Sequence, residues 1–147
     1  MSFTYEYPRP AVCADIIVFT SSKINSEILL IKRKFDPYKD KWALPGGFVD
    51  IDEELDSAAY RELEEETSIT NIKLEQFRAF GKIGRDPRGR TVSVVYYGFL
   101  PESEKSMAIA NSDAAEAKWY NIDSLPPLAF DHDEIIKLAI KSYLHKN

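Results

Sequence analysis

Four glutamates crowd into the six residues RELEEE, from Arg61 to Glu66. Like charges three or four residues apart on a helix repel one another, so this density needs a reason. The preceding residues have small and apolar side chains at helical spacing, and Glu62 and Glu66 continue that apolar stripe instead of opposing it. Ionised carboxylates that point into a fold need a positive partner. The cluster therefore predicts either a cation site or buried ion pairs with Lys or Arg.

The donor chemistry of the cluster narrows the choice of cation. Glu62, Glu65 and Glu66 offer oxygen alone, and an all-oxygen set selects hard divalent cations, Mg²⁺ or Mn²⁺, over zinc. Residues 50–66 hold nine acidic side chains and one basic side chain, in a chain whose net charge is −5. Such a negative focus favours cations and disfavours nucleic acid.

These glutamates are also the charged part of a longer motif that runs from Gly47 to Ile69. Five residues separate the glycine from the next fixed position, and seven more lead to an Arg-Glu pair. The fixed residues are, in order, Gly47, Glu53, Arg61, Glu62, Glu65 and Glu66. This spacing resembles the Nudix hydrolase box, with every charged position matched. The one departure is Ser68, which stands where the box has glycine. Serine in the left-handed conformation costs roughly 1 kcal/mol, unless the helix ends differently.

The resemblance implies a fold and a reaction. The fold is α/β, an α/β/α sandwich with a mixed β-sheet between helices. The reaction is Mg²⁺-dependent hydrolysis of a nucleoside diphosphate linked to another group. Carried over by position, the implied metal ligands are the carbonyl of Gly47 and the carboxylates of Glu62, Glu65 and Glu66. Glu53 and Arg61 resemble supporting residues that orient the glutamates, and Glu65 is also a catalytic candidate.

Two stretches outside the box point to a substrate. GRDPRGRTVS resembles the RDPRG segment of Nudix proteins that act on ADP-ribose, and LAFDHDEII resembles a stretch after the last strand in the same group. The implied reaction is cleavage of ADP-ribose to AMP and ribose 5-phosphate. The candidates for substrate binding are cationic, aromatic or imidazole side chains, namely Arg33, Phe35, Arg85, Arg88, Arg90, Phe130 and His132. For each of them, ordinary loop packing or solvation is the alternative.

The sequence leaves more than one candidate for the general base and more than one candidate function. We favour Glu116 as the base over Asp113, and Glu65 is a third candidate. Other enzymatic substrates are NADH, a nucleoside triphosphate or a dinucleoside polyphosphate. The alternative from another class is a non-catalytic ADP-ribose sensor. Because the sequence ends at Asn147, within or just beyond the final helix, we expect no winged helix after it.

Elements that would position these residues can be read from the hydrophobic pattern. We expect strands over residues 12–20, 28–31, 73–83, 92–100 and 117–121, with short strand pieces around the Gly46-Gly47 turn. A helix over 53–67 would start at an Asp52 N-cap. A final amphipathic helix would follow Asp131, with Glu134 completing a capping box.

Length and composition set the remaining expectations. The 147 residues, 44% hydrophobic and 29% charged, predict a single globular domain over 1–147. Cys13 is the only cysteine, which suits a reducing compartment. We see no signal peptide and no apolar run long enough for a membrane span, so we expect a cytoplasmic protein with a small-molecule nucleotide substrate and no nucleic-acid or membrane partner. By analogy with Nudix relatives, we expect a homodimer.

Overall fold

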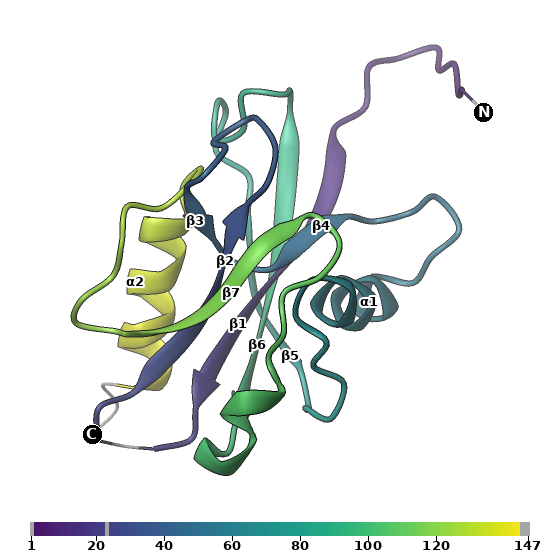
Figure 1. Ribbon diagram of the computed structural model, residues 1–147. Coiled ribbons are helices and arrows are strands. Elements are labelled where there is room, and N and C mark those ends of the chain that lie inside the picture. The colour runs from purple at the N-terminus through teal and green to yellow at the C-terminus, as the bar shows by residue number, and fades with distance from the viewer. Residues whose placement is uncertain (1, 23, 145–147) are drawn as a thin grey trace.

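The structure, a computed structural model, describes residues 2–22 and 24–144 and contains a mixed seven-stranded sheet (Figure 1). Its strands are β1 (Ala11–Thr20), β2 (Glu27–Arg33), β3 (Trp42–Ala43), β4 (Gly46–Phe48), β5 (Glu75–Phe80), β6 (Thr91–Leu100) and β7 (Ala114–Asn121). Its α-helices are α1 (Leu55–Thr67) and α2 (His132–Tyr143), and the 3-10 helix η1 spans Glu102–Met107. No helix within the described residues is long and apolar enough to cross a membrane.

Strand β1 is the centre of the sheet. The strand order is β3-β2-β1-β6-β5, with β4 pairing β1 and β7 pairing β2. β1 and β6 run parallel from the Ala11–Thr91 pair to the Thr20–Leu100 pair, while β2 and β4 pair with β1 antiparallel. The continuous apolar run of β1 follows from this position, because a central strand is buried on both faces.

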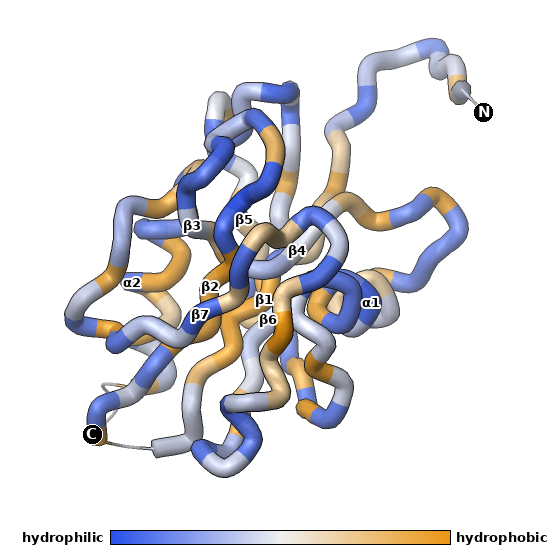
Figure 2. Tube along the Cα trace, in the orientation of Figure 1, coloured by the Kyte–Doolittle hydropathy of each residue, from blue (hydrophilic) through white to orange (hydrophobic). Residues whose placement is uncertain are grey.

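The two α-helices cover opposite faces of the sheet (Figure 1). Side chains of β1 alternate between them: Ile16 joins the cluster that holds Leu63 of α1, and Ile17 joins the cluster that holds Ile135 of α2. Hydrophobic residues accordingly lie along the central strands and hydrophilic residues in the surrounding loops (Figure 2). The predicted mixed sheet between helices is confirmed.

Several predicted boundaries differ from the structure. Helix α1 begins at Leu55, with Glu54 as its N-cap in extended conformation, so Asp52 is not the cap. Asp131 is the N-cap of α2, but its side chain makes no capping hydrogen bond, and the predicted capping box is therefore absent. Strand β5 is shorter than expected, and β7 starts three residues earlier, at Ala114. Ser68 adopts the left-handed conformation, with φ 65° and ψ 7°, as a C-terminal cap.

Candidate active site

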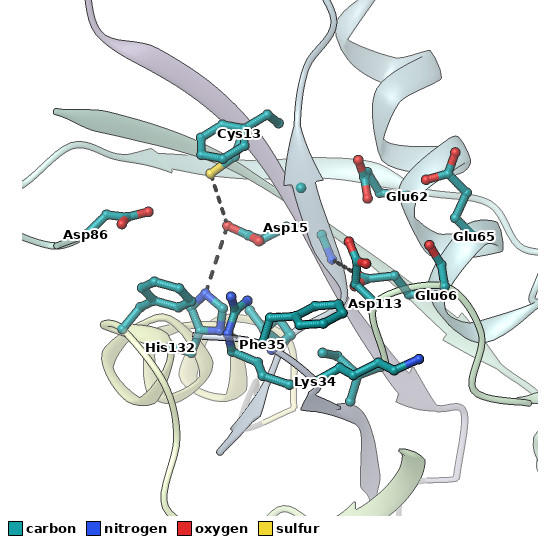
Figure 3. A pocket seen from close by; sticks show the side chains of 18 of the residues that line it. Cys13, Asp15, Lys34, Phe35, Glu62, Glu65, Glu66, Asp86, Asp113 and His132 are labelled. Atoms are coloured by element: carbon teal, nitrogen blue, oxygen red, sulfur yellow. Dashed lines mark hydrogen bonds and ion pairs between the residues drawn. The ribbon is translucent and has the colours of Figure 1, made fainter. Parts of the chain in front are cut away.

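A cavity of about 420 Å³ opens beside the sheet and gathers residues from distant parts of the chain. Figure 3 shows its arrangement: Glu62, Glu65 and Glu66 of α1 lie on one side, His132 and Asp86 lie on the other, and Asp15 of β1 lies between them. Charged and aromatic side chains of the loops after β2 and before β6 complete the wall. The cavity therefore brings the acidic box together with most of the predicted substrate-binding residues.

The acidic side of the cavity is the C-terminal half of α1. Glu66 is only 7% exposed, and its Oε1 accepts a 2.7 Å hydrogen bond from the backbone N–H of Gly46. Burial raises the pKa of Glu66 to about 8, although the Gly46 hydrogen bond opposes that shift. Burial also raises the pKa of Glu62, against the opposing effect of Arg61. Glu64 is exposed on the same helix, so the predicted inward direction of Glu62 and Glu66 is confirmed.

Arg61 holds the glutamates in place. Its Nε lies 2.5 Å from Oε2 of Glu53, and its Nη1 lies 2.9 Å from Glu62 and 3.2 Å from Glu65. Nη2 donates to the carbonyl of Phe48, which ties the side chain to β4. The hydrogen bond from Arg61 lowers the pKa of Glu53 to about 2. Arg61 and Glu53 are thus placed to orient the other carboxylates.

The carboxylates fit a hard divalent cation by their chemistry. A Cβ on Gly47 would lie 2.5 Å from the carboxyl carbon of Glu62, so the absence of a side chain leaves room for that carboxylate. Within the described residues, no three His, Cys, Asp or Glu side chains already converge on a common point, since Arg61 and Gly46 hold Glu62, Glu65 and Glu66. A cation would compete with Arg61 for two of these groups.

The predicted arginines on the cationic side of the cavity differ in whether a carboxylate binds them. Arg85 is bound through two hydrogen bonds to Asp131, and Arg88 is bound in the same way to Asp86. Among the described residues, no carboxylate lies within ion-pair distance of Arg33, whose Nε donates to the carbonyl of Pro37. Burial and the nearby Arg88 lower the pKa of Arg33. Arg33 thus makes no direct ion pair among the described residues, and the carboxylates of Glu66, Asp86 and Asp113 act on it only at longer range.

Arg90 and Glu116 do not reach the cavity. Neither is part of its wall. Glu116 lies on β7 opposite Lys32 of β2, and the two side chains form an ion pair of 3.4 Å on the surface. Asp113, the other predicted base, does line the cavity and lies near Glu66 in Figure 3. The structure therefore places Asp113 in the cavity wall and the favoured Glu116 outside it, because β7 begins immediately after Asp113 and carries Glu116 away.

Aromatic rings form the part of the wall next to the arginines. The guanidinium carbon of Arg88 lies 4.7 Å from the ring centroid of Phe48 and 5.3 Å from that of Phe130. Arg33 lies 5.0 Å from Phe130, and Phe35 is 57% exposed at the mouth. Phe130 has φ 53°, a conformation that non-glycine residues adopt at a cost and that concentrates at functional sites. Flat aromatic surfaces suit the stacking of a nucleobase.

His132 is more buried than a residue in the first turn of an exposed helix would be. It is 3% exposed, and its Nδ1 accepts a 3.0 Å hydrogen bond from the backbone N–H of Leu44. Burial lowers the pKa of His132, which favours the neutral ring. The side chain lines the cavity but is also part of the packing between α2 and the sheet.

Sequence reasoning missed several wall residues, among them Asp15, Lys34, Phe48 and Asp86. Asp15 had a signal, because it is the one charged residue in the apolar run of β1. Asp86 lies inside the RDPRG segment, where its carboxylate accepts hydrogen bonds from the backbone and side chain of Arg88. Nothing in the local sequence distinguishes Lys34 or Phe48 from ordinary surface residues.

Comparison with known proteins decides the family. A family model of the NUDIX domain matches residues 9–139. The chain belongs to the Nudix family. Its predicted α/β Nudix fold is confirmed by solved relatives. The MutT/nudix family protein from Enterococcus faecalis superposes with a TM-score of 0.86 at 32% identity, over 99% of this chain and 66% of that chain. The NUDIX domain of Shewanella oneidensis NrtR complexed with ADP ribose superposes with a TM-score of 0.82 at 30% identity, over 92% of this chain and 90% of that chain.

Curated relatives of this Nudix chain include an enzyme and a regulator. An ADP-ribose pyrophosphatase of Methanocaldococcus jannaschii is 40% identical over 131 residues, which cover 89% of this chain and 73% of the relative. The ADPR responsive transcriptional repressor NtrR of Acinetobacter baylyi is 37% identical over 138 residues, and the match spans 54% of its length. The family and the first relative confirm the predicted enzyme class, a Nudix pyrophosphohydrolase.

Proposed function

We propose that this Nudix protein hydrolyses ADP-ribose to AMP and ribose 5-phosphate with Mg²⁺ or Mn²⁺ as its cofactor. The observation that carries the proposal is the cavity, which joins the box glutamates to the unpaired Arg33 and to stacking surfaces. A diphosphate between two organic groups needs both a cation site and neutral or aromatic walls. Relatives named for ADP-ribose support the same substrate.

The cation would be held by Glu62, Glu65 and Glu66 with the carbonyl of Gly47. When bound, a divalent ion neutralises the diphosphate, orients it and lowers the pKa of water. Nudix hydrolases generally use divalent metals, which agrees with this oxygen-rich set. Arg61 would keep its hydrogen bonds to Glu53 and to the carbonyl of Phe48, and would orient from there the two carboxylates that it shares with the cation.

The remaining steps belong to other side chains of the cavity. Arg33 binds a phosphate oxygen, because its guanidinium has free N–H groups and no carboxylate partner among the described residues. Phe130, Phe48 and Phe35 pack against the adenine. Asp113 accepts the proton of the attacking water, and Glu65 is the alternative base. Arg85 and Arg88 stiffen the wall through their carboxylate partners.

A substrate panel tests this proposal. ADP-ribose, NADH, nucleoside triphosphates and diadenosine polyphosphates are incubated with the protein, with and without Mg²⁺ or Mn²⁺, and the products are separated by chromatography. We expect AMP and ribose 5-phosphate from ADP-ribose only with a divalent ion. Hydrolysis of a triphosphate while ADP-ribose stays intact would contradict the substrate.

The second candidate is a non-catalytic ADP-ribose sensor, favoured by the similarity to ADPR-responsive repressors. Tight ADP-ribose binding in calorimetry, with no product under any metal condition, would support it. A homodimer, a cytoplasmic location, the absence of a nucleic-acid partner and a single domain over 1–147 stay predictions, and light scattering tests the first.

A further inference from the structure

Asp15 is a buried carboxylate in the cavity to which the proposed function gives no task. It lies on β1, is 6% exposed and belongs to the cavity wall. In Figure 3 it stands between the glutamates of α1 and His132. A buried carboxylate is costly unless its oxygens have partners, so each oxygen needs an account.

One oxygen, Oδ2, is fully used by the protein. It accepts a 2.5 Å hydrogen bond from the hydroxyl of Ser93 and a 3.5 Å contact from the thiol of Cys13. Nε2 of His132 lies 4.0 Å away. Because Nδ1 of that ring accepts from Leu44, a neutral ring carries its proton on Nε2, which faces Oδ2. These groups fix the orientation of the carboxylate.

The other oxygen, Oδ1, has no donor among the described residues. Within the described residues, no fully buried side-chain nitrogen or oxygen lacks a hydrogen-bond partner. Because Oδ1 has no partner, it is not fully buried and is open to the cavity that Asp15 lines. Gly46 keeps it open: a Cβ there would lie 2.2 Å from Oδ1. The cavity therefore presents one oriented acceptor oxygen on a side chain that is otherwise enclosed.

The chemistry of Oδ1 defines what it can bind. A phosphate oxygen has no proton to donate to Oδ1 and carries charge of the same sign, so a phosphate would not satisfy this acceptor. A neutral hydrogen-bond donor satisfies the oxygen without that repulsion. An ADP-ribose-like substrate carries two such groups, the hydroxyls of its sugars and the exocyclic amine of its base.

We propose that Asp15 is a specificity-determining residue, whose Oδ1 accepts a hydrogen bond from a hydroxyl or amine of the bound nucleotide sugar. This role rests on the proposed function, because it names part of what the same cavity recognises. The interaction is a positioning contact and involves no transfer of a proton.

The test compares Asp15→Asn with the wild-type protein on three kinds of substrate. They are ADP-ribose, IDP-ribose, in which a carbonyl replaces the amine, and ADP-ribose analogues that each lack one sugar hydroxyl. In the variant, the single amide oxygen can still accept the hydrogen bond from Ser93 in the place of Oδ2. The amide N–H₂, a donor, then stands where Oδ1 was an acceptor. We expect kcat/KM for ADP-ribose to fall about 10-fold or more.

The analogues distinguish the two donors. If Oδ1 reads the amine, the wild type disfavours IDP-ribose and Asp15→Asn reverses that preference. If Oδ1 accepts from a hydroxyl, kcat/KM of the wild type is lower by about 10-fold or more for one deoxy analogue than for ADP-ribose. In Asp15→Asn, kcat/KM is then the same for that analogue and for ADP-ribose. Equal use of all analogues by the wild type overturns the proposal, as does an unchanged selectivity ratio in Asp15→Asn.

Asp123→Asn is the matched control, because it makes the same change at an exposed aspartate that is not part of the cavity wall. We expect wild-type kinetics and wild-type ratios between analogues. If Asp15→Asn fails to fold, Asp15→Ser takes its place in the same comparison, and equal use of all analogues by the wild type still overturns the proposal. If no substrate is cleaved, the proposed function fails separately, and the same ratios are measured as Kd values by calorimetry.

Discussion

The backbone N–H of Gly46 donates a 2.7 Å hydrogen bond to Oε1 of Glu66, which joins the glycine turn to the end of α1. No described residue donates to the other oxygen of Glu66. One bond therefore fixes the direction of a buried carboxylate while leaving an oxygen for a cation. The glycine turn and the box helix act as one unit through this contact.

Glu66→Gln should remove most of the activity and keep the fold. The amide still accepts the bond from Gly46 but carries no charge for a divalent ion. We expect kcat to fall by roughly 100-fold or more, with a melting temperature no lower than that of the wild type. Glu64→Gln, exposed on the same helix, is the matched control. Wild-type kinetics in Glu66→Gln would remove this residue from the site.

Without divalent ions, the free energy of unfolding should fall as pH rises from 4.5 to about 8. Burial holds the pKa of Glu66 at about 8, above its ordinary value of 4.5, so the folded state binds this proton more tightly. Its contribution is complete below 4.5 and is lost as pH rises through 8. In a chelator, the melting temperature should therefore drop by a few degrees between pH 6 and pH 9.

Two comparisons check the origin of this pH dependence. Glu66→Gln should flatten the slope, and Mg²⁺ or Mn²⁺ should raise the melting temperature more at pH 8.5 than at pH 6. A slope that is the same in wild type and variant would assign it to other groups.

Gly47→Ala should disturb Glu62 specifically. The new Cβ would meet that carboxylate at 2.5 Å, so the side chain must leave its place beside Arg61. We expect a loss of activity of about 10-fold or more and a weaker response of the melting temperature to divalent ions. Gly81→Ala is the control, because its Cβ has only ordinary contacts, the nearest at 3.6 Å. Equal effects of both substitutions would argue against a specific role.

Arg33→Gln should weaken substrate binding more than turnover. A charged hydrogen bond to a phosphate contributes about 1.5–3 kcal/mol, which corresponds to a KM increase of about 10-fold or more. Arg33→Lys should recover part of that loss, since it keeps the charge without the planar fork. Arg90→Gln, outside the cavity, should leave KM near the wild-type value. A larger effect at Arg90 than at Arg33 would reverse our assignment of the phosphate contact.

Ser68→Gly should stabilise the protein. Ser68 has φ 65°, which glycine adopts without the steric cost that serine bears, and the expected gain is about 0.5–1 kcal/mol. The serine hydroxyl donates to the carbonyl of Ile109 at an exposed position, so its loss offsets part of the gain. Ser68→Ala, which loses the hydroxyl but keeps the Cβ, separates the two effects in urea unfolding. A less stable Ser68→Gly would mean that the hydroxyl outweighs the backbone strain.

Local patterns predicted the parts of the site that lie within one element. The inward direction of Glu62 and Glu66 follows from helical periodicity, and the buried run of β1 follows from its apolar residues. Both depend on spacing over a few residues, which the sequence displays directly.

Local patterns could not predict contacts between residues that are far apart in the sequence. Arg85 lines the cavity as a predicted substrate-binding residue, but its hydrogen bonds to Asp131, 46 residues away in sequence, could not be predicted. The choice between Asp113 and Glu116 depended on where β7 begins and on its register with β2, which has an irregularity at Lys32/Arg33. These outcomes are set by tertiary contacts, and no local propensity encodes them.

The ion pair between Arg85 and Asp131 limits how this scaffold can be re-engineered. Its side chains are 3% and 13% exposed, so removing one partner strands a buried charge, typically at a cost of about 3–5 kcal/mol. A loop graft that replaces residues 82–90 with a sequence from another relative must therefore carry a compatible residue at position 131. The loop and the start of α2 are one exchangeable module, although more than forty residues lie between them.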